Sequence, residues 1–90
     1  MEKIQDKTIL SVIVPCFNEI NTLHKVIDNI QNSPVDNKEI IIVDDFSNDG
    51  SREFLKKVNS QNIKTIFHDK NLGKGAAIYS GIAIAKGDII

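Results

Sequence analysis

The sequence predicts an α/β fold in which a parallel sheet is covered by helices on both faces. Three apolar runs typical of strands alternate with three stretches that carry apolar residues at helical spacing. The runs at 9–14 and 39–43 are almost continuously apolar and rich in β-branched residues, as expected for strands buried on both faces. Such alternation forms βαβ units with right-handed crossovers, and these units build a parallel sheet.

The first strand is predicted at residues 9–14. Pro15 is expected to stop it, because proline has no amide hydrogen to donate to a ladder. After a polar loop, apolar residues at helical spacing predict an amphipathic helix, with Asn21 or Thr22 available as its cap. The residues of this apolar stripe are Leu23, Val26, Ile27 and Ile30.

The second strand is predicted at 39–43, where a continuous apolar run suits the middle of a parallel sheet. The next helix is expected to begin near Gly50, with Asp49 or Ser51 as a plausible cap. Its apolar stripe consists of Phe54, Leu55 and Val58.

The third strand is predicted at 63–67, where polar and apolar residues alternate. A loop with two glycines, 71–75, then leads into a helix of small residues that extends to Ala85. The apolar pair at 89–90 looks like the opening of a fourth strand. We therefore expect residues 1–90 to form a single, truncated domain.

Composition excludes several classes of function. The formal net charge is −1, from 11 basic and 12 acidic residues, so no basic surface for nucleic acid or for an anionic membrane is predicted. Cys16 is the only cysteine and cannot form an internal disulfide. The first residues lack a secretory signal, so a cytoplasmic location is expected. No window approaches the about 20 consecutive apolar residues of a membrane helix, although membrane association of a longer parent stays open.

Acidic residues follow the first two predicted strands. Asp44 and Asp45 come directly after the second strand, and Glu19 lies in the loop after the first. Because ligands bind outside the carboxyl ends of parallel strands, Glu19 and Asp44 are expected to converge on one crevice. Carboxylates accept hydrogen bonds from nucleobase N–H groups and ribose hydroxyls. The alternatives are that the aspartates only cap a turn and that Glu19 only favours a helix dipole.

Lys74 lies between two glycines at the start of the third predicted helix. Exposed amides, the positive end of the helix dipole and the ammonium group together favour an anion such as a diphosphate. The alternative is a simple turn, and no Walker motif is present. His24 and His68 have no partner at zinc-ligand spacing, and Cys16 has no evident base and is interpreted as a packing residue.

Four blocks of sequence together resemble a known family. They are Val-Ile-Val-Pro-Cys-Phe-Asn-Glu at 12–19, Glu-Ile-Ile-Ile-Val-Asp-Asp-Phe-Ser-Asn-Asp-Gly-Ser at 39–51, Asn-Leu-Gly-Lys-Gly-Ala-Ala at 71–77 and Ala-Lys-Gly-Asp-Ile-Ile at 85–90. In order and spacing these blocks are similar to the amino-terminal part of family 2 inverting glycosyltransferases, whose GT-A fold contains a Rossmann-like sheet. The third block is most similar to the branch that includes dolichyl-phosphate and other polyprenyl-phosphate sugar transferases.

The resemblance implies a nucleotide-binding half of an enzyme that transfers sugar from a nucleoside diphosphate sugar to an acceptor, with a polyprenyl phosphate as a candidate acceptor. It implies that Asp44 hydrogen-bonds the base and that Asp45 supports the loop. It also implies that Lys74 lies toward the diphosphate. The remaining residues that it places in the nucleoside pocket are Pro15, Phe17 and Glu19.

The family's catalytic base and its Asp-x-Asp motif, which holds magnesium or manganese, are not found in these 90 residues. Asp88 stands alone and is interpreted as a turn residue. We therefore expect no catalytic residue and no metal ligand in this chain, and no activity from the chain alone.

Three other classes remain as alternatives. A dinucleotide oxidoreductase would carry Gly-x-Gly-x-x-Gly after its first strand, where this chain has residues 15–19 instead. A module similar to response regulators would use Asp69 as a phosphoryl acceptor. A non-catalytic remnant would leave the acidic residues without a ligand.

Overall fold

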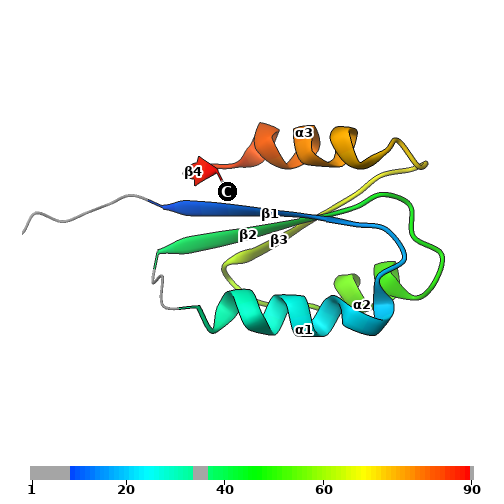
Figure 1. Ribbon diagram of the computed structural model, residues 1–90, viewed down its shortest axis with the longest axis horizontal. Coiled ribbons are helices and arrows are strands. Elements are labelled where there is room, and N and C mark those ends of the chain that lie inside the picture. The colour runs from blue at the N-terminus through cyan, green and yellow to red at the C-terminus, as the bar shows by residue number, and fades with distance from the viewer. Residues whose placement is uncertain (1–8, 34–36, 90) are drawn as a thin grey trace, which may run out of the picture.

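Four parallel strands form one sheet in the order β3-β2-β1-β4 in the computed structural model, which describes residues 9–33 and 37–89 (Figure 1). The strands are β1 (Leu10–Cys16), β2 (Lys38–Asp44), β3 (Ile63–Phe67) and β4 (Asp88–Ile89). The predicted parallel α/β sheet is confirmed. Ile89, expected to open a fourth strand, pairs with Ser11 of β1, and Ile90 lies outside the described residues.

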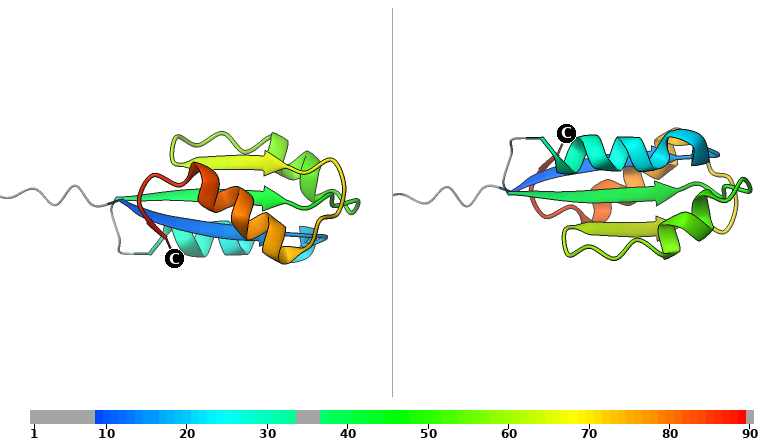
Figure 2. Two further views of the ribbon diagram at one scale, coloured as in Figure 1. Left: turned by 90° about the horizontal axis from the view of Figure 1, so that it is seen from above. Right: turned by 90° about the horizontal axis from the view of Figure 1, so that it is seen from below.

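Helices cover both faces of the sheet, as predicted (Figures 1 and 2). The helices are α1 (Ile20–Gln31), α2 (Ser51–Lys56) and α3 (Lys74–Ile84). α1 and α2 lie on one face, and α3 crosses β1 and β2 on the other. β2 lies between two strands and two layers of helix, which explains its continuous apolar sequence.

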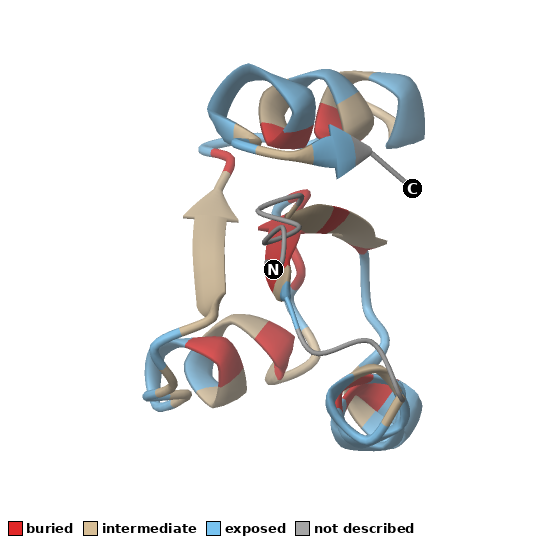
Figure 3. Cartoon of the chain, turned by 90° about the vertical axis from the view of Figure 1, so that its left-hand side faces the viewer, coloured by how far each residue is buried: buried red, intermediate tan, exposed pale blue. Residues whose placement is uncertain are grey.

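Alternation along β2 divides the core into two parts (Figure 3). Ile40 and Ile42 face α1 and α2, where they pack in a cluster with Leu23 and Leu55. Ile41 and Val43 face α3 and form a smaller cluster with Ala77. All four β2 side chains are fully buried, so β2 fixes the position of its carboxyl end relative to the helices on both sides.

β1 continues through Pro15 to Cys16, so the prediction that Pro15 stops the strand is wrong. The Cys16 carbonyl accepts a hydrogen bond from the Asp45 amide on the β2 side (2.8 Å). Neighbouring residues of a strand direct their backbone groups to opposite sides, so Pro15 faces the β4 side. Among the described residues β4 pairs only with Leu10 and Ser11, so proline costs the ladder no hydrogen bond.

The cap of α1 comes from the neighbouring loop, and the prediction of Asn21 or Thr22 is wrong. α1 already begins at Ile20, whose amide donates to Asp49 Oδ2 (3.0 Å). Asp49 Oδ1 accepts the amide of Ser51 at the start of α2 (3.0 Å). One carboxylate therefore serves two helix starts, a contact between distant segments that local capping rules do not reveal.

The packing of α3 on β1 requires glycine at position 81. A Cβ atom there would lie 2.6 Å from Cγ2 of Ile13. We expect Gly81→Ala to lower the free energy of unfolding by about 1–3 kcal/mol through overpacking, measured by urea denaturation. Gly75→Ala, in the same helix with nothing within 4 Å, is the matched control and should raise stability by up to about 1 kcal/mol. Equal effects of the two substitutions would refute this packing argument.

Glu39 holds the turn between α3 and β4 against the sheet. This contact lies at the opposite end of the sheet from the β1–α1 loop. Its carboxylate accepts hydrogen bonds from Ser11 Oγ (2.6 Å), from the Lys86 amide (2.6 Å) and from Lys64 Nζ (3.2 Å). Burial disfavours the charged form, but these three donors outweigh it and lower the pKa of Glu39 from 4.5 to about 2.

The low pKa of Glu39 predicts acid lability. Because its folded-state pKa lies below the unfolded one, its contribution is complete above pH 4.5 and is lost as the pH falls toward about 2. We expect Glu39→Gln to cost about 1.5–3 kcal/mol at neutral pH. The difference from wild type should shrink across that acidic window in urea titrations. Glu53→Gln, at an exposed position, is the control, and a pH-independent difference for Glu39→Gln would contradict the prediction.

Candidate functional site

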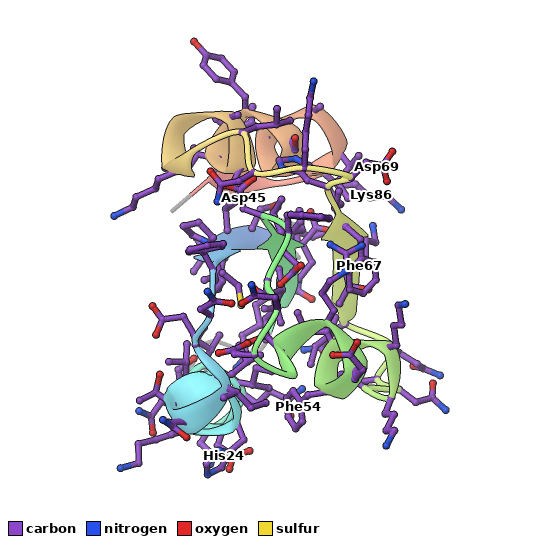
Figure 4. All side chains as sticks on the ribbon, turned by 90° about the vertical axis from the view of Figure 1, so that its right-hand side faces the viewer. His24, Asp45, Phe54, Phe67, Asp69 and Lys86 are labelled. Carbon is purple, nitrogen blue, oxygen red and sulfur yellow. The ribbon has the colours of Figure 1, made fainter. Side chains whose placement is uncertain are left out.

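The loops that follow β1, β2 and β3 meet at the carboxyl ends of the strands. This end of the sheet faces the viewer in Figure 4. A pocket of about 540 Å³ opens between them and the start of α3. Its position is the one expected for ligand binding in an open parallel sheet. The lining residues are Pro15, Cys16, Phe17, Glu19, Asp45, Asn71, Gly73, Lys74 and Ala77.

Five of the six predicted site residues line this pocket: Pro15, Phe17, Glu19, Asp45 and Lys74. They come from segments up to 59 positions apart in sequence, and the parallel sheet brings them together. Their contact with a nucleotide stays a prediction.

Asp44 does not line the pocket, so the expected convergence of Glu19 and Asp44 is wrong. Its side chain is 0% exposed and, like Ile42, faces the α1 and α2 side. Oδ2 accepts hydrogen bonds from Arg52 Nη1 (2.9 Å) and from the Ser47 amide (3.1 Å). Alternation along a strand explains the exchange. Consecutive side chains point to opposite faces, so Asp45 points toward α3 and into the pocket wall.

Asp45 lies beneath the start of α3 (Figure 4). Its carboxylate accepts hydrogen bonds from His68 Nδ1 and from the amides of Leu72 and Gly73, each at 2.8 Å. Burial opposes ionisation, but the three donors outweigh it and lower the pKa of Asp45. Asp45 is therefore an ionised acceptor in the pocket wall that also orders the loop between β3 and α3.

Two residues adjacent in sequence to residues that line the pocket have a positive φ, which is uncommon for residues other than glycine. Asn18 has a φ of 54° and Phe46 a φ of 69°. The two loops hold each other, since the Asn18 amide donates to Ser47 Oγ (2.9 Å) and the Asn48 amide donates to Asn18 Oδ1 (2.8 Å). These hydrogen bonds hold the loop that carries Phe17 against the turn after β2.

Lys74 begins α3 and lies at the pocket with its side chain exposed. Gly73 precedes it with a φ of 99°, a conformation that other residues rarely adopt. The first amides of α3 and the Lys74 ammonium group therefore meet at one side of the pocket, an arrangement that favours an anion.

The pKa of the Cys16 thiol is raised. Burial is the main cause, and the negative charge of Asp44 is the second. Cys16 is among the residues that line the pocket, and it packs in the core cluster. These observations agree with a packing role and not with a nucleophile.

Arg52 and His68 are structural parts of the site that the sequence reasoning missed. Arg52 Nη1 donates both to Asp44 and to the His68 carbonyl (2.8 Å), and its guanidinium lies 5.0 Å from the Phe67 ring centroid. One signal in the sequence could have indicated His68, because it directly follows the third strand. Residues that follow parallel strands lie at the carboxyl end of the sheet, where ligands bind, and the same rule was applied to Asp44.

Within the described residues, no group of three or more His, Cys, Asp or Glu side chains is arranged to hold a metal ion. Asp88 pairs with Leu10 at the end of β1 away from the pocket. Among the same residues, no helix has both the length and the apolar character needed to cross a membrane.

Comparison with known proteins identifies the class. The profile of "Glycosyl transferase family 2" matches residues 11–90. A cholesterol galactosyltransferase from Borreliella burgdorferi is 38% identical over 91 residues, covering 100% of this chain and 25% of that protein. An undecaprenyl-phosphate 4-deoxy-4-formamido-L-arabinose transferase from Aeromonas hydrophila is 31% identical, covering 94% of this chain and 28% of that protein. The chain belongs to glycosyl transferase family 2 and spans about a quarter of the length of these curated relatives.

Solved structures show the same fold. The mannosyltransferase PcManGT from Pyrobaculum calidifontis, in complex with GDP-Man and Mn²⁺, has a TM-score of 0.71 and 26% identity, covering 86% of this chain and 24% of that one. TarS 1-349 from S. aureus has a TM-score of 0.78 at 24% identity, covering 90% of this chain and 26% of that one. The predicted GT-A fold and family are thus confirmed.

Proposed function

We propose that this chain forms the nucleotide-binding part of an inverting glycosyltransferase whose donor is a nucleoside diphosphate sugar. One observation carries the proposal: a single pocket combines an ionised acceptor, Asp45, with a cationic helix start at Lys74. These two groups suit the two ends of a nucleoside diphosphate, since carboxylates accept N–H and O–H donors while the helix start favours phosphate.

In this proposal Asp45 accepts a hydrogen bond from the nucleobase, and Glu19 accepts hydrogen bonds from the nucleoside. Lys74 and the first amides of α3 lie toward the diphosphate. Pro15 and Phe17 form the apolar side of the pocket. Asp44 has an indirect role, because it holds the turn after β2 through Ser47.

A polyprenyl phosphate is the proposed acceptor. The name of the Aeromonas hydrophila relative contains undecaprenyl phosphate, which supports an acceptor of this chemical class. The Mn²⁺ bound with GDP-Man in PcManGT supports a divalent cation, Mg²⁺ or Mn²⁺, in a longer parent enzyme. Since the described residues supply no ligand set for it, we expect this 90-residue chain to bind nucleotide without transferring sugar.

The alternative of a signalling module gains no support from the described residues. Asp69, the phosphoryl acceptor of that alternative, is exposed and does not line the pocket (Figure 4).

Titration of the ¹⁵N-labelled chain with UDP, GDP and inorganic diphosphate tests the proposed function. We expect a nucleotide to shift the amide resonances of Glu19, Asp45 and Ala77. Inorganic diphosphate should shift mainly those at the start of α3. If neither nucleotide shifts any pocket amide at millimolar concentration, the proposed function is wrong and a non-catalytic remnant becomes the better interpretation.

A further inference from the structure

His68 connects Asp45 to helix α3 through two short hydrogen bonds. Its Nδ1 lies 2.8 Å from Asp45 Oδ1, and its Nε2 lies 2.8 Å from Ser80 Oγ. Its side chain is 8% exposed and is not among the residues that line the pocket. We propose that His68 is a positioning residue for the donor site: its Nδ1 donates to the Asp45 carboxylate and holds it toward the nucleoside, while Ser80 holds the ring at Nε2. This inference rests on the proposed function.

The chemistry of the three groups determines the direction of each hydrogen bond. An ionised carboxylate only accepts, so the proton between Asp45 and His68 belongs to Nδ1. In the neutral imidazole Nε2 then carries no proton and acts as an acceptor. The Ser80 hydroxyl must therefore donate to Nε2. Both hydrogen bonds therefore have the same direction: Ser80 of α3 donates to the imidazole, and the imidazole donates to Asp45 in the pocket wall.

The Asp45 carboxylate needs this support because its own torsion is weakly constrained. The χ2 angle of an aspartate has broad minima, so hydrogen bonds decide how the two oxygens are oriented. Among the described residues His68 is the only side chain that donates to this carboxylate, and the other two donors are the amides of Leu72 and Gly73. Of roughly four acceptor positions three are occupied, which leaves one for a ligand N–H.

The backbone of His68 is held independently of its ring. Its amide donates to the Asp44 carbonyl (2.9 Å), and its carbonyl accepts from Arg52 (2.8 Å). Substitution of the imidazole therefore leaves the chain at the end of β3 in place. A change in nucleotide affinity can then be separated from a change in folding.

Three variants separate the two ring nitrogens. The amide group of His68→Asn can occupy the Nδ1 position and donate to Asp45, whereas that of His68→Gln reaches toward the Nε2 position and leaves Asp45 without its side-chain donor. His68→Ala loses both contacts. We expect His68→Gln and His68→Ala to weaken UDP or GDP binding by about tenfold or more, because a hydrogen bond to a charged group is lost. His68→Asn should restore most of the affinity.

The order of affinities distinguishes positioning from structural support. If nucleotide affinity instead follows the urea midpoints of the variants, or if His68→Asn and His68→Gln weaken binding equally, the inference is wrong. Binding that survives His68→Ala unchanged also overturns the inference and leaves the proposed function intact. A wild-type chain that binds neither nucleotide overturns both.

Imidazole ¹⁵N resonances of the free wild-type chain provide a test that needs no nucleotide. We expect the spectrum of neutral His68 to show a protonated Nδ1 and an unprotonated Nε2. Ser80→Ala should shift the Nε2 resonance and leave Nδ1 protonated. The opposite tautomer in the wild-type chain would exclude donation to Asp45 and overturn the inference.

Discussion

Arg52→Ala is expected to lower the free energy of unfolding by about 3–5 kcal/mol, because it leaves the buried charge of Asp44 without its partner. Asp44 is 0% exposed, and Arg52, 19% exposed, is its only cationic partner among the described residues. The same guanidinium also holds the His68 carbonyl, so Arg52 connects α2 to the ends of β2 and β3. Urea denaturation followed by circular dichroism measures the loss.

Two variants on the same helix control this experiment. Lys56→Ala removes a cation that lies 5.8 Å from the Phe67 ring centroid, without an ion pair to Asp44, and should cost less than about 1 kcal/mol. Arg52→Lys keeps the charge but loses the planar group that reaches two acceptors, so an intermediate stability is expected. If Arg52→Ala is no more destabilising than Lys56→Ala, the buried ion pair does not stabilise the turn after β2.

Asp45→Asn is expected to weaken nucleotide binding by about tenfold or more, since it removes a charged acceptor from the pocket wall. The NH₂ group of an asparagine would also replace one of the two carboxylate oxygens, and its N–H donors would then face the amide of either Leu72 or Gly73, which itself donates. The loop before Lys74 should therefore lose order. NMR titration with UDP and GDP measures both effects.

Asp69→Asn is the matched control for Asp45→Asn. It makes the same change of charge at an exposed aspartate outside the pocket, so nucleotide affinity should stay within about twofold of wild type after charge screening. Equal losses in the two variants would show that net charge, and not the Asp45 carboxylate, controls binding.

Local sequence patterns predicted the strands and helices because burial dictates them. The apolar run at 39–43 forms the centre of β2, and the alternating run at 63–67 coincides with β3. Pro15 was misjudged because its effect depends on which neighbour its backbone faces, a property of the sheet order. The cap of α1 was missed because Asp49 lies about thirty positions away from the helix start.

Asp44 and Asp45 show which part of the site local sequence patterns could not predict. Strand alternation correctly predicted that Asp44 and Asp45 point in opposite directions. Which of them faces the pocket depends on which face of the sheet carries α3, and no local pattern contains that information. Arg52 and His68 were missed for the same reason, because their partners are fixed by the packing of α2 and α3.

The most direct test of the central claim is a measurement of intermolecular NOEs between a bound nucleotide and the labelled chain. If the pocket binds the nucleoside, base or ribose protons of UDP or GDP should give NOEs to the Ala77 methyl group and to the Phe17 ring, which both line it. NOEs confined to residues outside the pocket would contradict the account.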